Sequence, residues 1–478
     1  MGRPPRVLHV GNIGNYAWVN AKLMRARGVD CVILDPDFYH VASAPEWLEA
    51  EISGDPGDLF YPDWRAAGAR GFSRPEWFIN GPGPFVLREL AAREAGRKVA
   101  RARYAVLSAL YRRGLASAKG RRSRFRALME SDGQALRLAK AMARRLALGG
   151  AASRMAPAIH SEAFPSEPEM LPSSVPREII GKALAGFDVV LGYALGARFA
   201  HGVNHPRYAS LELGTLRGLP FEDTPLGVLA AGLYRQSPGV FVTNVDCLAA
   251  AARLGIPEER ITAIPHPFEL SAALAAATAH PVATEGRPLL LCPARHHWTK
   301  GNASWRKGND VLIRGAALAA ERGADFRLVF VEWGEDVNAS RELIAELGLS
   351  GRTRWVPTLP RRRLWALMLE ATCVLDQFDA SAFGGLALEG MALGRRVVTR
   401  LDQAPPAAFF SMTPPLLAAA TPEELAARIL QILRDPGDAE GIGRRGMEWM
   451  EREHGEDRQL ALQFAAFERL LAASGASS

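Results

Sequence analysis

The chain has 478 residues, 48% of them hydrophobic and 23% charged, which is the balance of a globular protein with two or three domains rather than of a disordered chain. No apolar run approaches the roughly 18 residues that a membrane span needs, and the first residues lack the apolar segment of a secretory signal. The net charge of +7 favours an anionic partner, and the four widely spaced cysteines match no zinc or redox motif, so we expect a cytoplasmic protein.

The first residues have the pattern of a β-loop-α-β unit. Residues 6–10 favour a buried strand, residues 11–15 a turn, residues 17–27 a helix and residues 31–34 a second strand. This is how a doubly wound sheet begins, and such sheets bind ligands in the loops after their strands. The glycines Gly11 and Gly14 do not have dinucleotide-motif spacing, so two interpretations stay open: a ligand loop, or glycines that only permit the turn.

The next part of the chain departs from this rhythm. Residues 36–84 alternate prolines and tryptophans, which predicts an excursion off the sheet with short helices and its own small apolar cluster. Residues 85–150 hold 17 lysines and arginines against 4 acidic residues, with apolar residues at helical spacing and a dense basic run at residues 121–126. Basic amphipathic helices bind anionic membranes or phosphorylated ligands, but they also occur as solvated insertions. No nucleic-acid module accompanies them, so nucleic acid is not expected.

After irregular residues 151–176 the α/β rhythm resumes. The predicted strands are residues 187–191, 208–213, 240–243 and 261–264. His201, His205 and His266 are candidates to line a cleft, although a lone histidine near a strand end is more often structural. Their scattered positions form no metal motif.

A proline-bounded linker at residues 281–288 precedes a second predicted sheet. Its first strand, residues 289–292, leads into a loop that holds six basic or imidazole side chains before a helix that begins near Asn309: Arg295, His296, His297, Lys300, Arg306 and Lys307. Clustered cations in front of a helix N-terminus suit a diphosphate. The later predicted elements are strands 327–331, 353–356 and 373–376, and helices 340–347, 361–370, 421–434 and 455–473.

Residues 376–399 form the most informative stretch. A strand end leads through small residues to Gly384 and Gly385, then to a helix from about Leu386 that Gly394 ends, and then to a strand at residues 396–399. The free N–H groups of a helix start favour a phosphate. Glu389 lies one turn after Gly385, where a carboxylate can accept hydrogen bonds from ribose hydroxyls. The alternative is an ordinary turn between strand and helix.

Residues 382–394, AFGGLALEGMALG, fit a helix-start motif in which two glutamates lie eight residues apart. With Arg295 and the Lys307-Gly308 pair, they resemble retaining GT-B glycosyltransferases of glycosyltransferase family four. The Gly11/Gly14 loop and residues 264–267 resemble the family more weakly, and residues 36–176 do not resemble it.

The resemblance implies an α/β fold of two Rossmann-like domains facing across a cleft. The acceptor domain would be residues 1–280, with an insertion at 36–176 whose basic helical part is 85–150. The nucleotide-sugar domain would be residues 281–455, and the C-terminal helix 456–478 would pack back towards the first domain. The implied activity moves a sugar from a nucleotide-diphosphate sugar to a hydroxyl of a glycan or lipid-linked acceptor, with retention and without a metal ion or cofactor.

Residue roles follow from the same resemblance. The catalytic residues would be Arg295, Lys307 and Glu389; the donor would contact Ser381, Phe383, Gly384, Gly385, Leu386 and Glu389; and the acceptor side would include Gly11, Gly14, Asn15, Arg217 and His266. An anionic membrane surface is a further expected partner, through residues 85–150.

The sequence also departs from the family. Ser381 replaces the first glutamate of the pair, which contacts the transferred sugar, and Asp376 and Asp379 are candidates to replace it. His266 replaces an asparagine, and Lys300 competes with Lys307 for the lysine role. The replacement by serine keeps a non-catalytic nucleotide-sugar-binding subunit open, and a nucleotide-sugar epimerase of the same fold is a further alternative.

Overall fold

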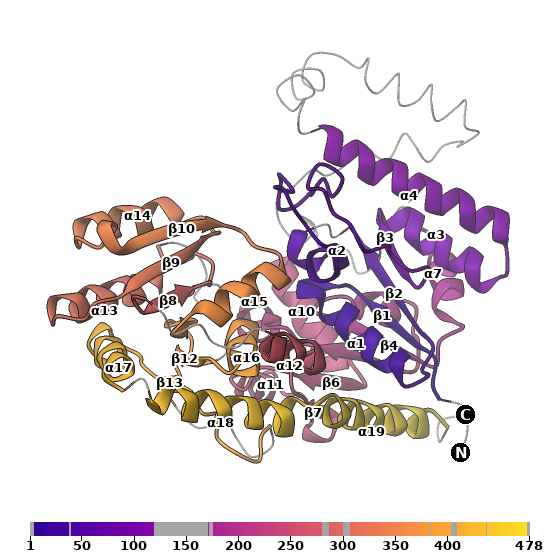
Figure 1. Ribbon diagram of the computed structural model, residues 1–478. Coiled ribbons are helices and arrows are strands. Elements are labelled where there is room, and N and C mark those ends of the chain that lie inside the picture. The colour runs from indigo at the N-terminus through magenta and orange to yellow at the C-terminus, as the bar shows by residue number, and fades with distance from the viewer. Residues whose placement is uncertain are drawn as a thin grey trace. The chain divides into compact units, whose positions relative to one another are not determined.

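The computed structural model describes residues 4–37, 40–118, 171, 175–279, 286–299, 306–382, 384–402, 409–435 and 437–475 (Figure 1). The chain divides into two compact units. Unit 1 comprises Met1–Leu211, Leu219–Val240 and Phe467–Ser478, and unit 2 comprises Glu212–Gly218 and Phe241–Ala466.

The first sheet has seven strands in the order β3-β2-β1-β4-β5-β6-β7. They are β1 (Val7–Val10), β2 (Cys31–Pro36), β3 (Phe78–Gly81), β4 (Val189–Tyr193), β5 (Tyr208–Leu211), β6 (Gly239–Val242) and β7 (Ile261–Ala263). Strand β1 pairs in parallel with β2, Val7 opposite Cys31, and with β4, Val7 opposite Val189. All residues of β1 and nearly all of β2 are buried, as expected of strands covered by helices on both faces.

Helices follow the strands of this sheet in the order that a doubly wound fold requires. They are η1 (Ile13–Asn15), α1 (Tyr16–Ala26), η2 (Val41–Ser43), α2 (Pro45–Glu49), α3 (Gly83–Glu94), α4 (Lys98–Ala118), α7 (Arg177–Leu184), α8 (Arg198–Gly202), α9 (Thr215–Gly218), η5 (Leu219–Phe221), α10 (Pro225–Gln236), α11 (Cys247–Arg253) and η6 (Glu258–Arg260). Helix α3 packs against α4 and α7, and these three helices lie together in Figure 1.

The second sheet has six strands in the order β10-β9-β8-β11-β12-β13, and every pair is parallel. Its strands are β8 (Leu289–Cys292), β9 (Arg327–Glu332), β10 (Thr353–Pro357), β11 (Cys373–Leu375), β12 (Arg396–Thr399) and β13 (Leu417–Ala418). The helices of unit 2 beyond β7 are α12 (Leu270–Ala279), α13 (Asn309–Glu321), α14 (Val337–Glu346), η8 (Ser350–Arg352), α15 (Arg361–Glu370), α16 (Gly385–Ala392), α17 (Pro422–Arg434), α18 (Gly437–His454) and α19 (Glu456–Gly475), the last reaching into unit 1. The expected fold class, α/β with two Rossmann-like parallel sheets, is confirmed.

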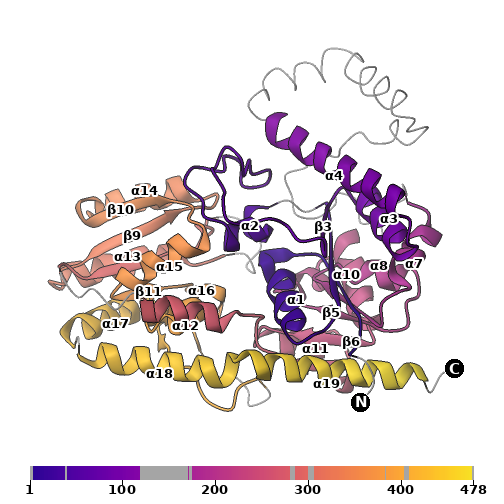
Figure 2. The same cartoon turned by 45° about the vertical axis from the view of Figure 1, so that its right-hand side comes forward.

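Alternate residues along the strands of the second sheet face two different helix layers. Cys373 and Leu375 of β11 belong to a core cluster with residues of α13, α14 and α17. A side chain added at Gly390 of α16 would instead contact Val374 and Val397, which places α16 on the opposite face. Helix α16 also packs against α12 and α18, and α12, α15 and α16 lie side by side in both ribbon views (Figures 1 and 2).

Two expectations for residues 36–84 have different outcomes. The expected small apolar cluster is confirmed, because Trp47 is buried with Val41, Ile52 and Ala67. The expectation of an excursion off the sheet over the whole range is wrong, because Phe78–Gly81 forms the edge strand β3, paired in parallel with β2. Of the basic residues 85–150, the described part is helical in α3 and α4, and residues 119–150 lie outside the described residues.

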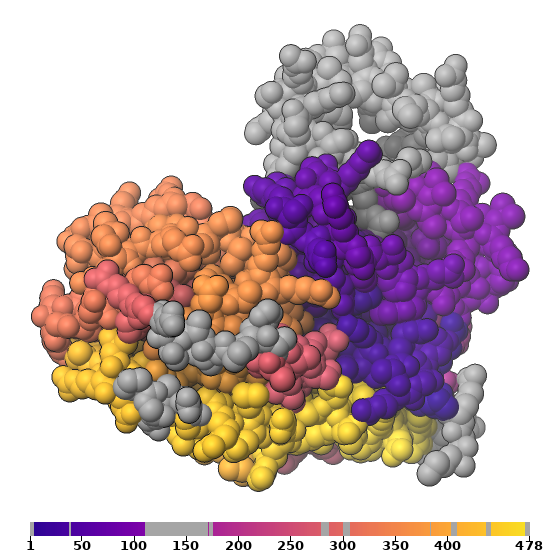
Figure 3. Space-filling view, in the orientation of Figure 1, coloured from indigo at the N-terminus to yellow at the C-terminus, as the bar shows by residue number. Residues whose placement is uncertain are grey.

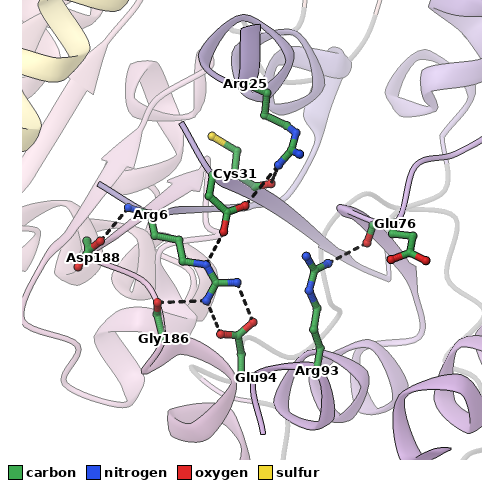
Figure 4. A network of polar contacts seen from close by, with 9 residues as sticks. Arg6, Arg25, Cys31, Glu76, Arg93, Glu94, Gly186 and Asp188 are labelled. Carbon is green, nitrogen blue, oxygen red and sulfur yellow. Dashed lines mark hydrogen bonds and ion pairs between the residues drawn. The ribbon is translucent and has the colours of Figure 1, made fainter. Parts of the chain in front are cut away.

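One arginine ties the start of the first sheet to the helix layer that covers it. The Arg6 guanidinium forms a bidentate pair with Glu94 at the end of α3, with the second contact at 3.1 Å, and donates to Asp30 at 2.7 Å (Figure 4). It also donates to the carbonyl of Gly186 at 3.2 Å. A bidentate charged pair fixes direction as well as distance, so this network holds α3 against the N-terminal edge of β1.

All four cysteines are free and buried. None of the described helices is both long and apolar enough to cross a bilayer.

Candidate functional site

The glycine stretch forms the expected strand, loop and helix in unit 2. Strand β11 ends at Leu375, and α16 begins at Gly385, one residue before the expected start. Gly394 has φ +68° and its N–H donates to Met391, so the expected left-handed end of the helix is confirmed. The N–H of Gly384, at the helix start, donates to the carboxylate of the buried Asp376 at 3.3 Å. Phe383 lies outside the described residues.

Lys307 is brought to this helix start by a close approach of two loops. Gly308 has φ +66°, and a Cβ added there would lie 2.8 Å from the backbone of Phe378 and Asp379, so only glycine fits. The N–H of Phe378 donates to the carbonyl of Lys307 at 2.8 Å. The Lys307 ammonium donates to Oε1 of Gln377 at 2.6 Å. Helix α13 then starts at Asn309, as expected.

The charges around Lys307 bring several candidate residues together. Burial lowers the pKa of Lys307 to about 8; Asp376 opposes this, whereas Arg295 and Arg217 lower the pKa further. Burial lowers the pKa of the Arg295 guanidinium as well. Three cationic side chains, of which two are expected to be catalytic, are thus close enough for the charges of the two arginines to act on the lysine.

Two acidic residues partly balance this charge. Asp379, which raises the pKa of Lys307, lies 3.7 Å from the Arg306 guanidinium. Asp376 is only 4% exposed; burial raises its pKa and the charge of Lys307 lowers it. Of the two candidates to replace the missing glutamate, Asp376 lies nearer the helix start, and Asp379 is held by an arginine.

Glu389 lies in the second turn of α16 and is 9% exposed. Its Oε1 is 3.3 Å from Nε of Arg361, the first residue of α15. Burial raises the pKa of Glu389, and the Arg361 charge opposes that shift. Glu389 thus belongs to a buried ion pair, a feature that the helix-start motif does not indicate.

Ser381 has a structural contact in place of the family's glutamate. Its hydroxyl accepts a hydrogen bond at 2.8 Å from the N–H of Asp402. The Arg400 guanidinium donates to the carbonyl of Asp379 at 2.8 Å, so two bonds fasten the loop before α16 to the segment after β12. Leu386, the second residue of α16, is partly exposed at the helix start.

The loop that carries Arg217 is held by a carboxylate that the sequence analysis missed. The fully buried Glu212, just after β5, accepts hydrogen bonds from the N–H groups of Gly214, Thr243 and Asn244 at 2.6, 3.1 and 2.9 Å. Arg217 makes a bidentate pair with Asp246, which itself precedes α11. Burial lowers the pKa of His266 to about 4, so its imidazole is neutral at pH 7.

His296 is not part of the cation cluster, and that expectation is wrong. Its ring is fully buried, its Nδ1 lies 2.8 Å from the Ser340 hydroxyl, and burial lowers its pKa to about 4. The ring packs against Phe330 and Trp355. Lys300 lies outside the described residues.

The candidate residues of the first loop belong to unit 1 and make internal bonds. The Asn15 amide is fully buried and donates to the carbonyls of Ala42 and Ala44 at 2.8 and 3.0 Å. The N–H of Gly14 donates to the Ser43 hydroxyl at 2.9 Å. Gly11 and Gly14 have φ of +87° and +59°, so the turn does require glycines.

The remaining histidine candidates have local partners. His201 Nδ1 is 2.9 Å from the Tyr208 hydroxyl, and His205 Nδ1 is 3.1 Å from the carbonyl of Arg207. In the part of the chain that the structure describes, no group of three or more acidic, histidine or cysteine side chains is placed to hold a metal ion.

The chain is similar to known glycosyltransferases over part of its length. Residues 298–449 match the model of the family described as glycosyl transferases group 1. The chain is 27% identical to 2-deoxystreptamine glucosyltransferase of Streptomyces kanamyceticus over 246 aligned residues. These residues are 50% of this chain and 62% of that relative.

Solved structures show lower similarity. HepE of Anabaena, in complex with UDP and glucose, is 17% identical with a TM-score of 0.47 over 60% of this chain and 82% of that one. TarM of S. aureus (a point mutant), in complex with fondaparinux, alpha-GlcNAc-glycerol and UDP, is 14% identical with a TM-score of 0.46. That match covers 61% of this chain and 58% of TarM. The segment that matches the glycosyl transferases group 1 model, residues 298–449, contains Lys307, Arg361 and Glu389.

Proposed function

We propose that the chain is a glycosyltransferase that moves a sugar from a nucleotide-diphosphate sugar to an acceptor hydroxyl, with retention at the anomeric carbon. The observation that supports this most is the position of Lys307 at the loop before α16, where the charges of Arg295 and Arg217 act on it, in the unit whose residues 298–449 match a glycosyltransferase family model. A glycan, polysaccharide or glycolipid hydroxyl is the expected acceptor class.

Each group has a distinct role in this proposal. Lys307 and Arg295 neutralise the negative charge that grows on the departing diphosphate, and the N–H groups at the start of α16, Gly384 to Leu386, donate hydrogen bonds to it, the Gly384 N–H leaving Asp376 to do so. Interactions that strengthen as the leaving group departs lower the barrier, whereas equal binding of substrate and transition state would not. Because the cations supply the compensating charge, we propose a mechanism without a metal ion. Glu389 would hold the ribose.

The first step is to find the donor. A thermal-shift screen of UDP, GDP, ADP and their glucose conjugates identifies a ligand because binding to the folded state alone raises the melting temperature. Glucose conjugates come first because the curated relative is named a glucosyltransferase. No shift with any of these nucleotides would argue against the proposal.

The second step tests the cation cluster. Lys307→Ala is expected to lower turnover of the selected donor by on the order of 100-fold, as expected for loss of a group that stabilises a developing charge. Arg363→Ala is the matched control, because Arg363 is exposed on α15 of the same unit. Equal turnover by wild type and Lys307→Ala would remove this lysine from the mechanism.

The same assays separate the two alternatives. Donor binding without transfer or hydrolysis would favour a non-catalytic binding subunit. A new sugar nucleotide formed from the donor alone would favour an epimerase.

A second proposal concerns an anionic membrane as the place of reaction. On α4, Val99 is 86% exposed and Val106 is 56% exposed, two turns apart on one helix face, with the exposed Arg103 between them. The segment around α4 is at the surface in Figure 3 (violet). Exposed apolar residues flanked by arginine suit the interface of an anionic bilayer. Flotation with vesicles that contain anionic lipid, and none with neutral vesicles, would support this; equal binding to both, or none, would contradict it.

A further inference from the structure

The ion pair between Arg361 and Glu389 joins two helices on one face of the second sheet. Arg361 follows Pro360 at the start of α15, and Glu389 lies in α16. Both side chains are largely buried, with 15% and 11% of their surface exposed. We propose that Arg361 is the positioning residue that orients Glu389 so that its second carboxylate oxygen can bind the ribose of the donor. This inference rests on the function proposed above.

The two oxygens of Glu389 have different surroundings. Oε1 is 3.3 Å from the Arg361 guanidinium. Oε2 is buried and makes no hydrogen bond of standard geometry among the described residues, and the Trp365 indole N–H, which acts on the same carboxylate, is buried and unbonded as well. A buried carboxylate oxygen without a partner is unfavourable, so the fold keeps it at a cost unless a ligand supplies a donor. A ribose hydroxyl is such a donor, and it would come from the same ligand whose diphosphate lies at the helix start.

The guanidinium is itself held in place. Its central carbon lies 5.4 Å from the centroid of the Trp365 ring, one turn further along α15. Trp365 is 6% exposed and also lies beside the Glu389 carboxylate, whose pKa it lowers. A planar guanidinium fixed against an aromatic ring has few orientations, so it fixes the direction of the carboxylate.

The charge of Arg361 has a second effect on the same group. Burial raises the pKa of Glu389, and Arg361 is the largest influence that lowers it. An ionised carboxylate only accepts hydrogen bonds, whereas a protonated one also donates. Arg361 thereby keeps Oε2 an acceptor, which a ribose hydroxyl requires.

The role predicts which property of the protein depends on Arg361. Losing the guanidinium should reduce the preference for a ribose hydroxyl and leave the binding of the diphosphate intact. A purely structural role would weaken all nucleotides equally. The ratio of two dissociation constants therefore separates positioning from stability.

The experiment uses the full chain and the nucleoside diphosphate that the thermal-shift screen selects, with its 2′-deoxy and 3′-deoxy forms. For the wild type we expect a preference of about 10-fold or more for the ribose form, from a hydrogen bond to a charged group. In Arg361→Gln that preference should fall to within about 3-fold, as in Glu389→Gln. The double variant should lose no more than either single variant, because Arg361 acts through Glu389. Arg363→Gln, an exposed arginine on the same helix, should keep the wild-type preference.

The outcomes are distinct. If Glu389→Gln loses the ribose preference and Arg361→Gln keeps it, the inference is overturned and the proposed function stands. If the wild type binds none of the nucleoside diphosphates, the proposed function fails and the inference fails with it. Should Arg361→Gln not fold, Arg361→Lys replaces it: lysine keeps the charge without the planar fork, and an unchanged preference in that variant would also overturn the inference.

Discussion

The ammonium of Lys307 donates a hydrogen bond of 2.6 Å to the side-chain oxygen of Gln377. Gln377 is the second residue after β11, and its own amide nitrogen donates to the carbonyl of Ala382. A neutral partner therefore holds the lysine at the loop before α16. The charge of the neighbouring Asp376 acts on the lysine through space. A neutral partner is easily exchanged for a phosphate, and this arrangement leads to two predictions about pH.

The first prediction concerns the alkaline limit of nucleotide binding. Burial lowers the pKa of Lys307 to about 8, so its charge is present below pH 8 and is lost as the pH rises through that value. Above pH 8 the affinity for a nucleoside diphosphate should fall towards about 10-fold per pH unit. Lys307→Arg should bind with little change up to pH 9.5, because a guanidinium keeps its proton. Calorimetric titration from pH 7.5 to 9.5 measures the affinity of the wild type and of Lys307→Arg. An identical loss of affinity at alkaline pH in the two proteins would exclude Lys307 as its cause.

The second prediction concerns Asp376, whose negative charge raises the pKa of Lys307. Asp376→Asn keeps the shape of the side chain and removes that charge. The alkaline limit of binding should then move down by about one pH unit, the size of shift that a nearby opposite charge produces. The same titration tests it, with Asp402→Asn, which is more exposed, as control. An unmoved limit in Asp376→Asn would show that the two side chains are not coupled.

The sequence was most informative where glycine geometry and strand patterns coincide. Gly308 and Gly394 both have positive φ. The start of α13 after Gly308 was expected at the observed residue, and the start of α16, the helix that ends before Gly394, was expected within one residue. The positions of Lys307 and Glu389 near one helix start follow from this β-loop-α pattern, because the carboxyl ends of neighbouring parallel strands share one edge.

Other features were hidden for physical reasons. Helix α18 contains Gly443, which looks like a helix breaker, but a Cβ added there would clash with the carbonyl oxygen of Gly394, which follows α16. Gly443 is a glycine because α18 approaches the end of α16 closely there. The Arg361–Glu389 pair joins elements 28 residues apart, and no local pattern predicts which of three successive arginines turns inward.

The third prediction concerns acid stability. His454 is fully buried against Phe410 and Trp449, and burial lowers its pKa well below 6.5, with further lowering by the nearby His266 and Arg458. The folded state then binds fewer protons than the unfolded state, so stability is full above pH 6.5 and is lost as the pH falls below it.

In His454→Phe the unfolded state no longer has the imidazole that binds this extra proton. Relative to the wild type, His454→Phe should gain about 1.4 kcal/mol in unfolding free energy for each pH unit below 6.5. The ring still packs against its aromatic neighbours, so the two proteins should be similar at pH 7.5. Urea unfolding at pH 7.5, 6.5 and 5.5 measures the difference in unfolding free energy. If the unfolding free energies of the two proteins changed equally with pH, the pKa of His454 would not differ between the folded and unfolded states.

The last prediction concerns Glu212, the carboxylate under the loop that carries Arg217. Every recorded partner of its two oxygens is a donor: the N–H groups of Gly214, Thr243 and Asn244, the Thr243 hydroxyl and the Asn244 amide. Glu212→Gln places an NH₂ group against N–H donors in a fully buried site, which should cost about 2–4 kcal/mol of unfolding free energy. Urea unfolding checks this, with the exposed Glu258→Gln as control. The variant should also bind the nucleoside diphosphate more weakly, because the loop bearing Arg217 loses its anchor beside Lys307. A stability equal to that of the control would mean that the loop is held by other contacts, such as the Arg217–Asp246 pair.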